Sequence, residues 1–108
     1  MNDAADIVDA APAASVVIAS VNGWHALEPT LAAVDMGRDI ALANKEVMVV
    51  AGELIRRRAE RSGARLLPVD SEHNAVFQAL LGRDRSYLRR IVLTASGGPF
   101  RSHTREQL

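Results

Sequence analysis

Three short apolar runs, separated by stretches of helical periodicity, constrain the fold of this chain more than any other feature. They are residues 15–20 (SVVIAS), 39–43 (DIALA) and 65–69 (RLLPV). Each run has the length of a buried strand and is too short for a core helix. An alternation of strand and helix requires right-handed crossovers, which align the strands in parallel. The sequence therefore predicts an α/β fold built on a parallel sheet.

The stretches between the runs have the signals of helices. Residues near 27–36 carry leucine and valine at helical spacing, with Pro29 in the first turn and Gly37 as a stop. A second helix follows residue 46 and ends at Gly63. Its predicted apolar face comprises Val47, Val50, Ala51 and Leu54.

Two further elements are predicted after the third strand. Apolar residues resume at helical spacing near residues 76–81, so a third helix is expected there. A polar connection at 83–86 then leads to residues 88–95, whose apolar and β-branched content predicts a last strand.

Composition and charge exclude several classes of function. The 13 basic and 13 acidic residues leave no net charge to favour nucleic acid or a membrane surface. Arginines at 56–58 and 61 are locally basic, but no aromatic row accompanies them, so we interpret them as a solvated helix face. The absence of cysteine excludes disulfides and thiolate chemistry. The sequence has no apolar run of about 18 residues, and its acidic start lacks the basic segment and apolar core that are typical of a signal peptide. We expect a cytoplasmic protein.

An abrupt polar cluster, residues 70–74 (DSEHN), stands between the third strand and the helix after it. In open α/β sheets, ligands bind outside the carboxyl ends of the strands. Asp70 and Glu72 are two residues apart, so in extended backbone they would leave on one face and converge on one divalent cation. The alternative is helix capping by Asp70, Ser71 or Asn74, which spacing alone favours.

Two other polar groups follow predicted strands. Asn44-Lys45-Glu46 places an amide, a cation and a carboxylate after the second strand, although helix-start polarity alone also explains it. Ser96-Gly97-Gly98 offers a hydroxyl and unobstructed N–H groups to a phosphate, and its alternative is a simple turn.

Three separated strings resemble the 1-deoxy-D-xylulose 5-phosphate reductoisomerases of non-mevalonate isoprenoid biosynthesis. They are ALANKE at 41–46, PVDSEHNAVFQ at 68–78 and LTASGGPFR at 93–101. The resemblance covers nearly the whole chain, but the family's glycine-rich dinucleotide turn and third metal carboxylate have no counterpart. It implies an internal fragment: residues 1–69 as the C-terminal part of a Rossmann-like NADPH-binding domain, and 70–108 as the start of an α/β catalytic domain.

The resemblance implies two cofactors and the residues that hold them. Asn44 and Glu46 are expected to contact NADPH, which would supply a hydride. Asp70 and Glu72 are expected to bind Mg²⁺ or Mn²⁺, hard cations that prefer oxygen ligands.

The resemblance also implies a substrate, 1-deoxy-D-xylulose 5-phosphate, and a product, 2-C-methyl-D-erythritol 4-phosphate. Ser71 and Glu72 are expected to contact the substrate, and Ser96 its phosphate. Lys45 would stabilise negative charge developing on the reacting oxygens. Family subunits are expected to form homodimers, and the isolated chain is expected to be inactive.

The sequence departs from the family at two places. Trp24-His25 stands where small residues are usual, and Val47-Met48 stands where serine and leucine are common. Trp24 is expected to pack rather than react, and His73 to be structural. The alternative to an enzyme segment is a non-catalytic Rossmann-like remnant with a role in folding or protein interaction.

Overall fold

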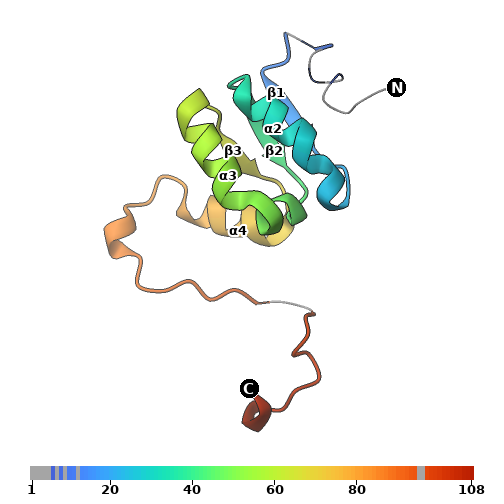
Figure 1. Ribbon diagram of the computed structural model, residues 1–108. Helices are drawn as coiled ribbons and strands as arrows, with labels where there is room; N and C mark the ends of the chain where they lie inside the picture. The colour runs from blue at the N-terminus through green and yellow to red at the C-terminus, as the bar shows by residue number, and fades with distance from the viewer. Residues whose placement is uncertain (1–5, 7, 9, 12, 95–96) are drawn as a thin grey trace.

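A computed structural model of the chain describes residues 6, 8, 10, 11, 13–94 and 97–108. Its centre is a three-stranded sheet in which all strands run parallel, in the order β1-β2-β3 (Figure 1). The strands are β1 (Val16–Ala19), β2 (Asp39–Leu42) and β3 (Leu66–Pro68). The predicted α/β class and parallel sheet are confirmed, with each strand slightly shorter than its apolar run.

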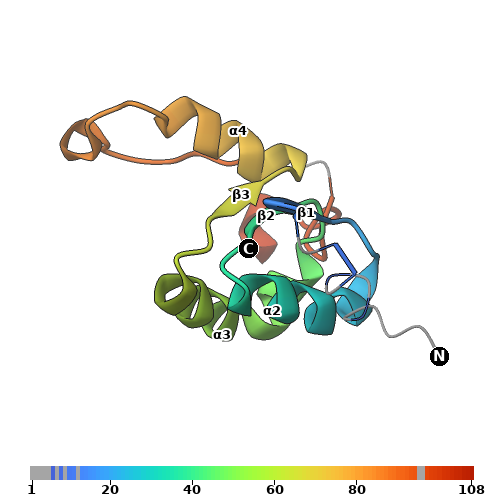
Figure 2. The ribbon, with the colours of Figure 1, turned by 90° about the horizontal axis from the view of Figure 1, so that it is seen from above.

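Helices lie on both faces of this sheet. The four helical elements that pack around it are the 3₁₀-helix η1 (Gly23–Ala26), α2 (Leu27–Asp35), α3 (Glu46–Ser62) and α4 (Ser71–Leu80). Figure 2 shows α2 and α3 side by side against one face, and α4 on the opposite side next to β3. The predicted stop of α3 is confirmed, because Gly63 adopts φ +81° and its N–H donates to the Ala59 carbonyl.

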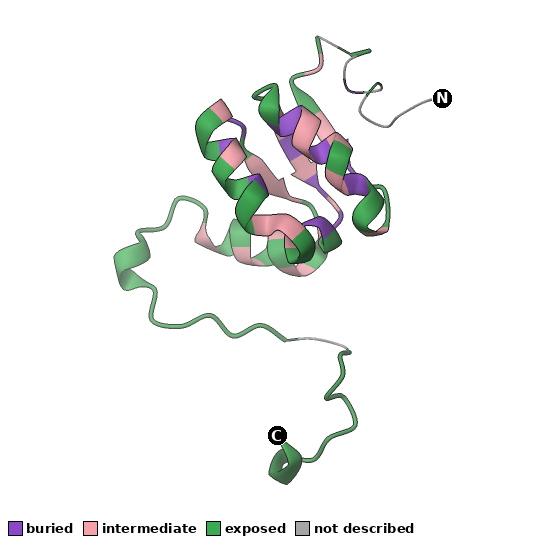
Figure 3. Ribbon diagram, in the orientation of Figure 1, coloured by how far each residue is buried: buried purple, intermediate pink, exposed green. Residues whose placement is uncertain are grey.

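The hydrophobic core lies between the sheet and the α2–α3 layer. The large side chains that are fully buried there are Val34, Ile40, Val47 and Ile55. Figure 3 shows the buried residues concentrated in these elements, whereas α4 and the chain after it are largely exposed. The packed part of the molecule therefore consists of β1 to β3 with α2 and α3.

The predicted apolar face of α3 is partly wrong. Val50 and Leu54 are 62% and 43% exposed, and the buried positions are instead Val47, Ile55 and Ala59. At Ala51 the backbone leaves the helical region, with φ −141° and ψ 25°, and two helical segments join there. Positions four apart line one side of a helix, so Val47, Ile55 and Ala59 lie on one buried row, and Val50 lies outside it.

The predicted strand at 88–95 is also wrong over its described part. Residues 88–94 form no strand and are exposed, and they follow the 3₁₀-helix η2 (Arg85–Tyr87). A strand needs a neighbour to pair with, and the described residues supply none beside this segment. The chain after α4 runs away from the sheet to η3 (Arg105–Gln107), and the radius of gyration is 16.5 Å. A compact chain of this length would have about 13 Å.

None of the described helices combines the length and apolar character needed to span a lipid bilayer.

Candidate functional site

The polar motifs after β2 and β3 meet at the carboxyl edge of the sheet. The N–H groups of Val69 and Asp70 both donate to the carbonyl of Leu42, at 2.9 and 3.3 Å. Beside them, the Ala43 N–H donates to the Ala19 carbonyl at 3.0 Å. These bonds continue the parallel pairing past the strand ends, so residues 43–46 and 70–73 leave the sheet as neighbours.

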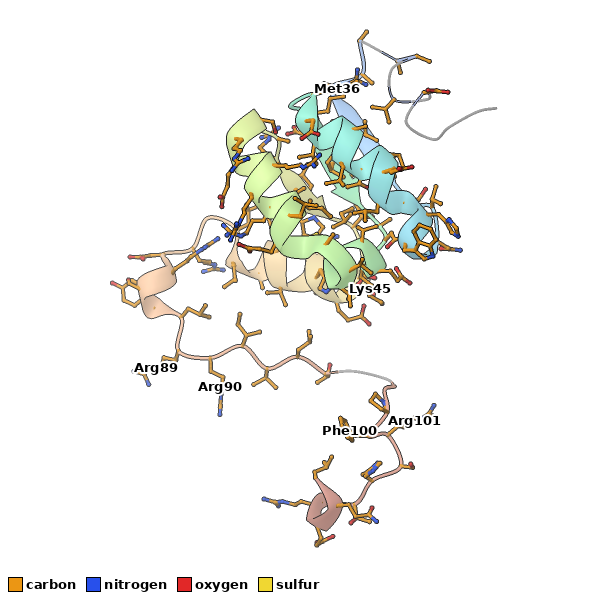
Figure 4. The ribbon with its side chains drawn as sticks, viewed as in Figure 1. Met36, Lys45, Arg89, Arg90, Phe100 and Arg101 are labelled. Atoms are coloured by element: carbon orange, nitrogen blue, oxygen red, sulfur yellow. The ribbon has the colours of Figure 1, made fainter. Side chains whose placement is uncertain are left out.

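Lys45 and Asp70 form an ion pair across this edge. The Nζ atom of Lys45 lies 3.2 Å from Oδ2 of Asp70, and the two side chains are 54% and 14% exposed. The hydrogen bond from the ammonium lowers the pKa of Asp70, and the same bond raises the pKa of Lys45. Both groups are therefore charged at neutral pH. Figure 4 shows Lys45 at the N-terminal end of α3, on the side nearest α4.

The Asp70 carboxylate does not cap α4, although Asp70 is the residue before the helix. Its backbone is non-helical, and its side chain accepts no hydrogen bond from the first turn. Atom Oδ1 is buried and has no hydrogen-bond partner among the described residues. Nδ1 of His73 lies 3.6 Å from this oxygen, which is too long for a hydrogen bond. Capping thus does not account for this side chain, and a buried carboxylate oxygen is left with an unused lone pair.

Glu72 has a different setting from the one predicted. Helix α4 begins at Ser71, so Glu72 lies in its first turn and the argument from extended backbone is wrong. The Ser71 hydroxyl donates to Oε2 of Glu72 at 2.8 Å. Across the residues that the structure describes, no three side chains of the metal-binding types gather at one point. Asp70 and Glu72 therefore provide at most part of a cation site.

A cavity of about 240 Å³ opens beside the ion pair. Its lining comes from β2, β3 and the starts of α3 and α4: Leu42, Asn44, Lys45, Met48, Leu66, Pro68 and His73. Ligand pockets commonly measure about 300–1,000 Å³. The cavity is smaller than that range, as expected if these residues form only one wall of a binding site.

Asn44 is buried and fastens two loops together. It is 4% exposed, and its Nδ2 atom donates to the carbonyls of Gly23, at 2.9 Å, and Val21. Its Oδ1 accepts the N–H of Val47 at 3.2 Å. Both amide protons and the oxygen are thus used inside the protein, and Asn44 holds the chain after β1 against the start of α3.

The remaining predicted site residues differ in their location and exposure. Glu46 is the first residue of α3 and is exposed. Ser96 lies outside the described residues, and Gly97 and Gly98 after it are exposed. The edge of the sheet brings together Asn44, Lys45, Asp70 and the start of α4, and it leaves the Gly97-Gly98 segment elsewhere.

Two residues that line the cavity were not predicted as site residues: His73 was expected to be structural, and Met48 was noted only as a departure from the family. His73 lies three positions after Asp70, a spacing that places both on one side of a helix start, so this signal was present in the sequence. Met48 lies at the same interval after Lys45.

Two family comparisons match the chain. Residues 1–52 match the 1-deoxy-D-xylulose 5-phosphate reductoisomerase family, and residues 66–108 match the C-terminal domain of the same family. The relative from Symbiobacterium thermophilum is 59% identical over 90 residues, which are 83% of this chain and 23% of that protein. The relative from Exiguobacterium sibiricum is 54% identical over 101 residues, or 94% of this chain and 26% of that protein. Both carry the name 1-deoxy-D-xylulose 5-phosphate reductoisomerase.

Solved structures agree with these matches. The reductoisomerase of Zymomonas mobilis in complex with NADPH superimposes with a TM-score of 0.76 at 48% identity, covering 94% of this chain and 27% of that one. A reductoisomerase in complex with NADPH, fosmidomycin and magnesium gives 0.67 at 43% identity, covering 71% and 19%. The chain thus spans about a quarter of the length of the relatives that it matches.

Proposed function

Because the chain belongs to the 1-deoxy-D-xylulose 5-phosphate reductoisomerase family, we propose that it supplies the metal- and substrate-facing edge of an NADPH-dependent reductoisomerase. The proposed reaction converts 1-deoxy-D-xylulose 5-phosphate to 2-C-methyl-D-erythritol 4-phosphate, by rearrangement of the carbon skeleton and then hydride transfer. The observation that carries the proposal is the Asp70 carboxylate: it pairs with Lys45, does not cap α4, and has a buried oxygen without a hydrogen-bond partner among the described residues.

The acidic residues at this edge fit a hard divalent cation. Oxygen ligands suit Mg²⁺ or Mn²⁺, and Oδ1 of Asp70 is a buried oxygen without a hydrogen-bond partner in the described structure. Glu72 in the next turn is the proposed second ligand, held by the Ser71 hydroxyl. When bound, the metal would act as a Lewis acid toward the substrate ketone. Asp70 and Glu72 would hold that charge beside Lys45, which lines the cavity.

Lys45 and Ser71 are the proposed substrate contacts from this chain. The Lys45 ammonium is half exposed and borders the cavity, so it can reach substrate oxygens while staying within reach of Asp70. A fixed positive charge there stabilises negative charge that develops as the skeleton rearranges. Ser96, outside the described residues, remains the proposed phosphate contact.

The two proposed cofactor residues are supported unequally. Glu46 is exposed at the start of α3 and free to approach a ligand. Asn44 has its side-chain atoms engaged within the protein, so we assign it a positioning role: it holds the loop after β1 beside the start of α3. NADPH, when bound, would supply the hydride. The cytoplasmic location, the division at residues 69 and 70, and a homodimeric assembly remain predictions.

The proposal is tested with a hybrid enzyme. The 90-residue stretch of this chain that matches the Symbiobacterium thermophilum relative replaces its counterpart there, and NADPH oxidation is followed with substrate and Mg²⁺ or Mn²⁺. We expect substrate-dependent turnover from the hybrid and none from the purified 108-residue chain, because reacting groups must be held in a complete, ordered site. A folded hybrid that binds NADPH and shows no turnover would contradict the proposal and favour a non-catalytic remnant.

A further inference from the structure

Two aromatic side chains stack on each other at the same edge of the sheet. The rings of Trp24 and His25 have centroids 4.3 Å apart and planes inclined by 29°. Both residues belong to η1, which follows the carboxyl end of β1. Trp24 is 64% exposed even though His25 covers part of its ring. Trp24 therefore packs against His25, and much of the indole surface faces solvent.

Hydrogen bonds from the buried residue Asn44 hold the loop that leads into this pair. Asn44 donates to the carbonyls of Val21 and Gly23, which lie just before the two aromatic residues. Gly23 adopts φ +72°, a left-handed conformation that a glycine reaches without strain and that turns the chain into η1. Ala26, at the end of η1, is 1% exposed and anchors the other side. The residues on either side of the pair are thus anchored at the carboxyl edge of the sheet, two strands away from Asp70.

We infer that the Trp24–His25 pair is a stacking platform for a heteroaromatic ring of the dinucleotide cofactor, an inference that rests on the proposed NADPH dependence. An indole offers a large flat π-face that stacks on planar rings of any base. The stacked imidazole restrains the indole, so little side-chain freedom remains to be lost on binding. Adenine and nicotinamide are both planar rings, and the platform suits the chemistry that they share.

Trp24 is the only tryptophan, so its indole N–H gives a single resonance that reports on the platform directly. The purified chain is titrated with NADPH while proton–nitrogen spectra are recorded, a method that also follows weak binding. Stacking of a ring on the indole should shift this resonance saturably. Parallel titrations with 2′,5′-ADP and with reduced nicotinamide mononucleotide identify the ring. A shift of the indole resonance with one of these two compounds assigns the ring of that compound to the platform. If NADPH and both compounds leave the resonance unshifted, the inference is overturned.

Variants separate stacking from simple bulk. Trp24→Ala and Trp24→Leu should weaken NADPH binding by about 5- to 150-fold, because both remove the π-face. Trp24→Phe keeps a ring and should stay within a few-fold of the parent chain. The control is Tyr87→Ala, which removes an aromatic ring that is 84% exposed on η2 and should leave the affinity unchanged. Amide resonances outside η1 serve two purposes. Without ligand, their positions should match those of the parent chain, which confirms the fold of each variant; during the titration, their shifts report NADPH binding.

The outcomes distinguish this inference from the proposed function. If the parent chain binds NADPH and Trp24→Ala binds equally well, the platform is wrong and the NADPH proposal stands. If the folded parent chain binds no NADPH at concentrations up to several millimolar, the inference and the cofactor assignment of this segment both fail.

Discussion

The Nζ atom of Lys45 lies 3.2 Å from Oδ2 of Asp70, which joins the residues immediately before two helices. Lys45 precedes α3 and Asp70 precedes α4, and the two are 25 positions apart in the sequence. Their contact follows from the parallel pairing of β2 and β3, which ends both strands at one edge. The arrangement sets a cation, a carboxylate with a free oxygen and a small cavity side by side.

The ion pair predicts a pH dependence. Lys45 lowers the pKa of Asp70, so Lys45→Met should raise that pKa, as measured by NMR titration of the carboxyl group. A carboxyl with a lowered folded-state pKa stabilises the protein above its unfolded pKa of about 3.9, and that stability is lost as pH falls through the lowered value. The stability gap between parent and variant should be constant near neutrality and shrink below about pH 4. Lys45→Arg, which keeps the cation, should retain most of the stability that Lys45→Met loses. An unchanged Asp70 pKa in Lys45→Met would refute the pairing.

The free oxygen of Asp70 predicts weak binding of a divalent cation by the chain itself. Mn²⁺ is paramagnetic, and it should broaden amide resonances near residues 70–73 first. Asp70→Asn should abolish this selective broadening, because an amide is a much poorer ligand for a hard cation. Asp84→Asn is a matched control, since Asp84 accepts the Ser86 N–H before η2 as a simple local cap. Broadening that persists in Asp70→Asn would exclude Asp70 as a ligand.

The burial pattern of α3 predicts that substitutions at two apolar positions of this helix lower the free energy of unfolding by different amounts. Ile55 is fully buried, so Ile55→Ala should reduce the free energy of unfolding by about 2–5 kcal/mol. Val50→Ala, at a position that is 62% exposed, should change it by less than about 0.5 kcal/mol. Urea denaturation measures both, and the milder Ile55→Val serves if Ile55→Ala fails to fold. An equal loss of unfolding free energy at the two positions would contradict the burial of Ile55 and the exposure of Val50.

The fold was predictable where its signals are local. Short β-branched runs and helical periodicity identified three strands and the helices between them. The inward face of α3 was predictable only in part, because the helix has more apolar residues than one face holds, and periodicity alone does not say which row of them meets the sheet. Residues 88–94 have the composition of a strand, but a strand also requires a pairing partner, and composition does not supply one.

The hydrogen bonds of Asn44 predict that the nearly isosteric change Asn44→Asp lowers the stability of the chain. Asn44→Asp keeps an acceptor for the Val47 N–H but removes the donors to the carbonyls of Val21 and Gly23. Leaving these groups without their donor should destabilise the chain by about 1–3 kcal/mol. Amide resonances of η1 should shift more than those of α4. Urea denaturation and one spectrum test this, and an unchanged stability would show that the loop does not depend on Asn44.

The site was predictable in its residue types and less so in its geometry. The order of polar residues after each strand placed Lys45 and Asp70 at one edge, as the structure has them. Glu72 was expected in extended backbone, but α4 begins at Ser71. Asp70 is therefore the last non-helical residue, and Glu72 lies inside the helix. The internal role of Asn44 also lay beyond the pattern, since its partners are backbone carbonyls more than 20 residues away.

The central claim, that Asp70 belongs to a metal and substrate site, is tested most directly by the kinetics of the hybrid enzyme with Asp70→Asn. The substitution is nearly isosteric, so it removes the charge while leaving the packing in place. We predict that kcat falls by at least about 100-fold, that the KM for NADPH changes less than about threefold, and that more Mn²⁺ is needed for half-maximal rate. A variant that keeps its kcat at saturation, or that loses NADPH affinity instead, would contradict the claim.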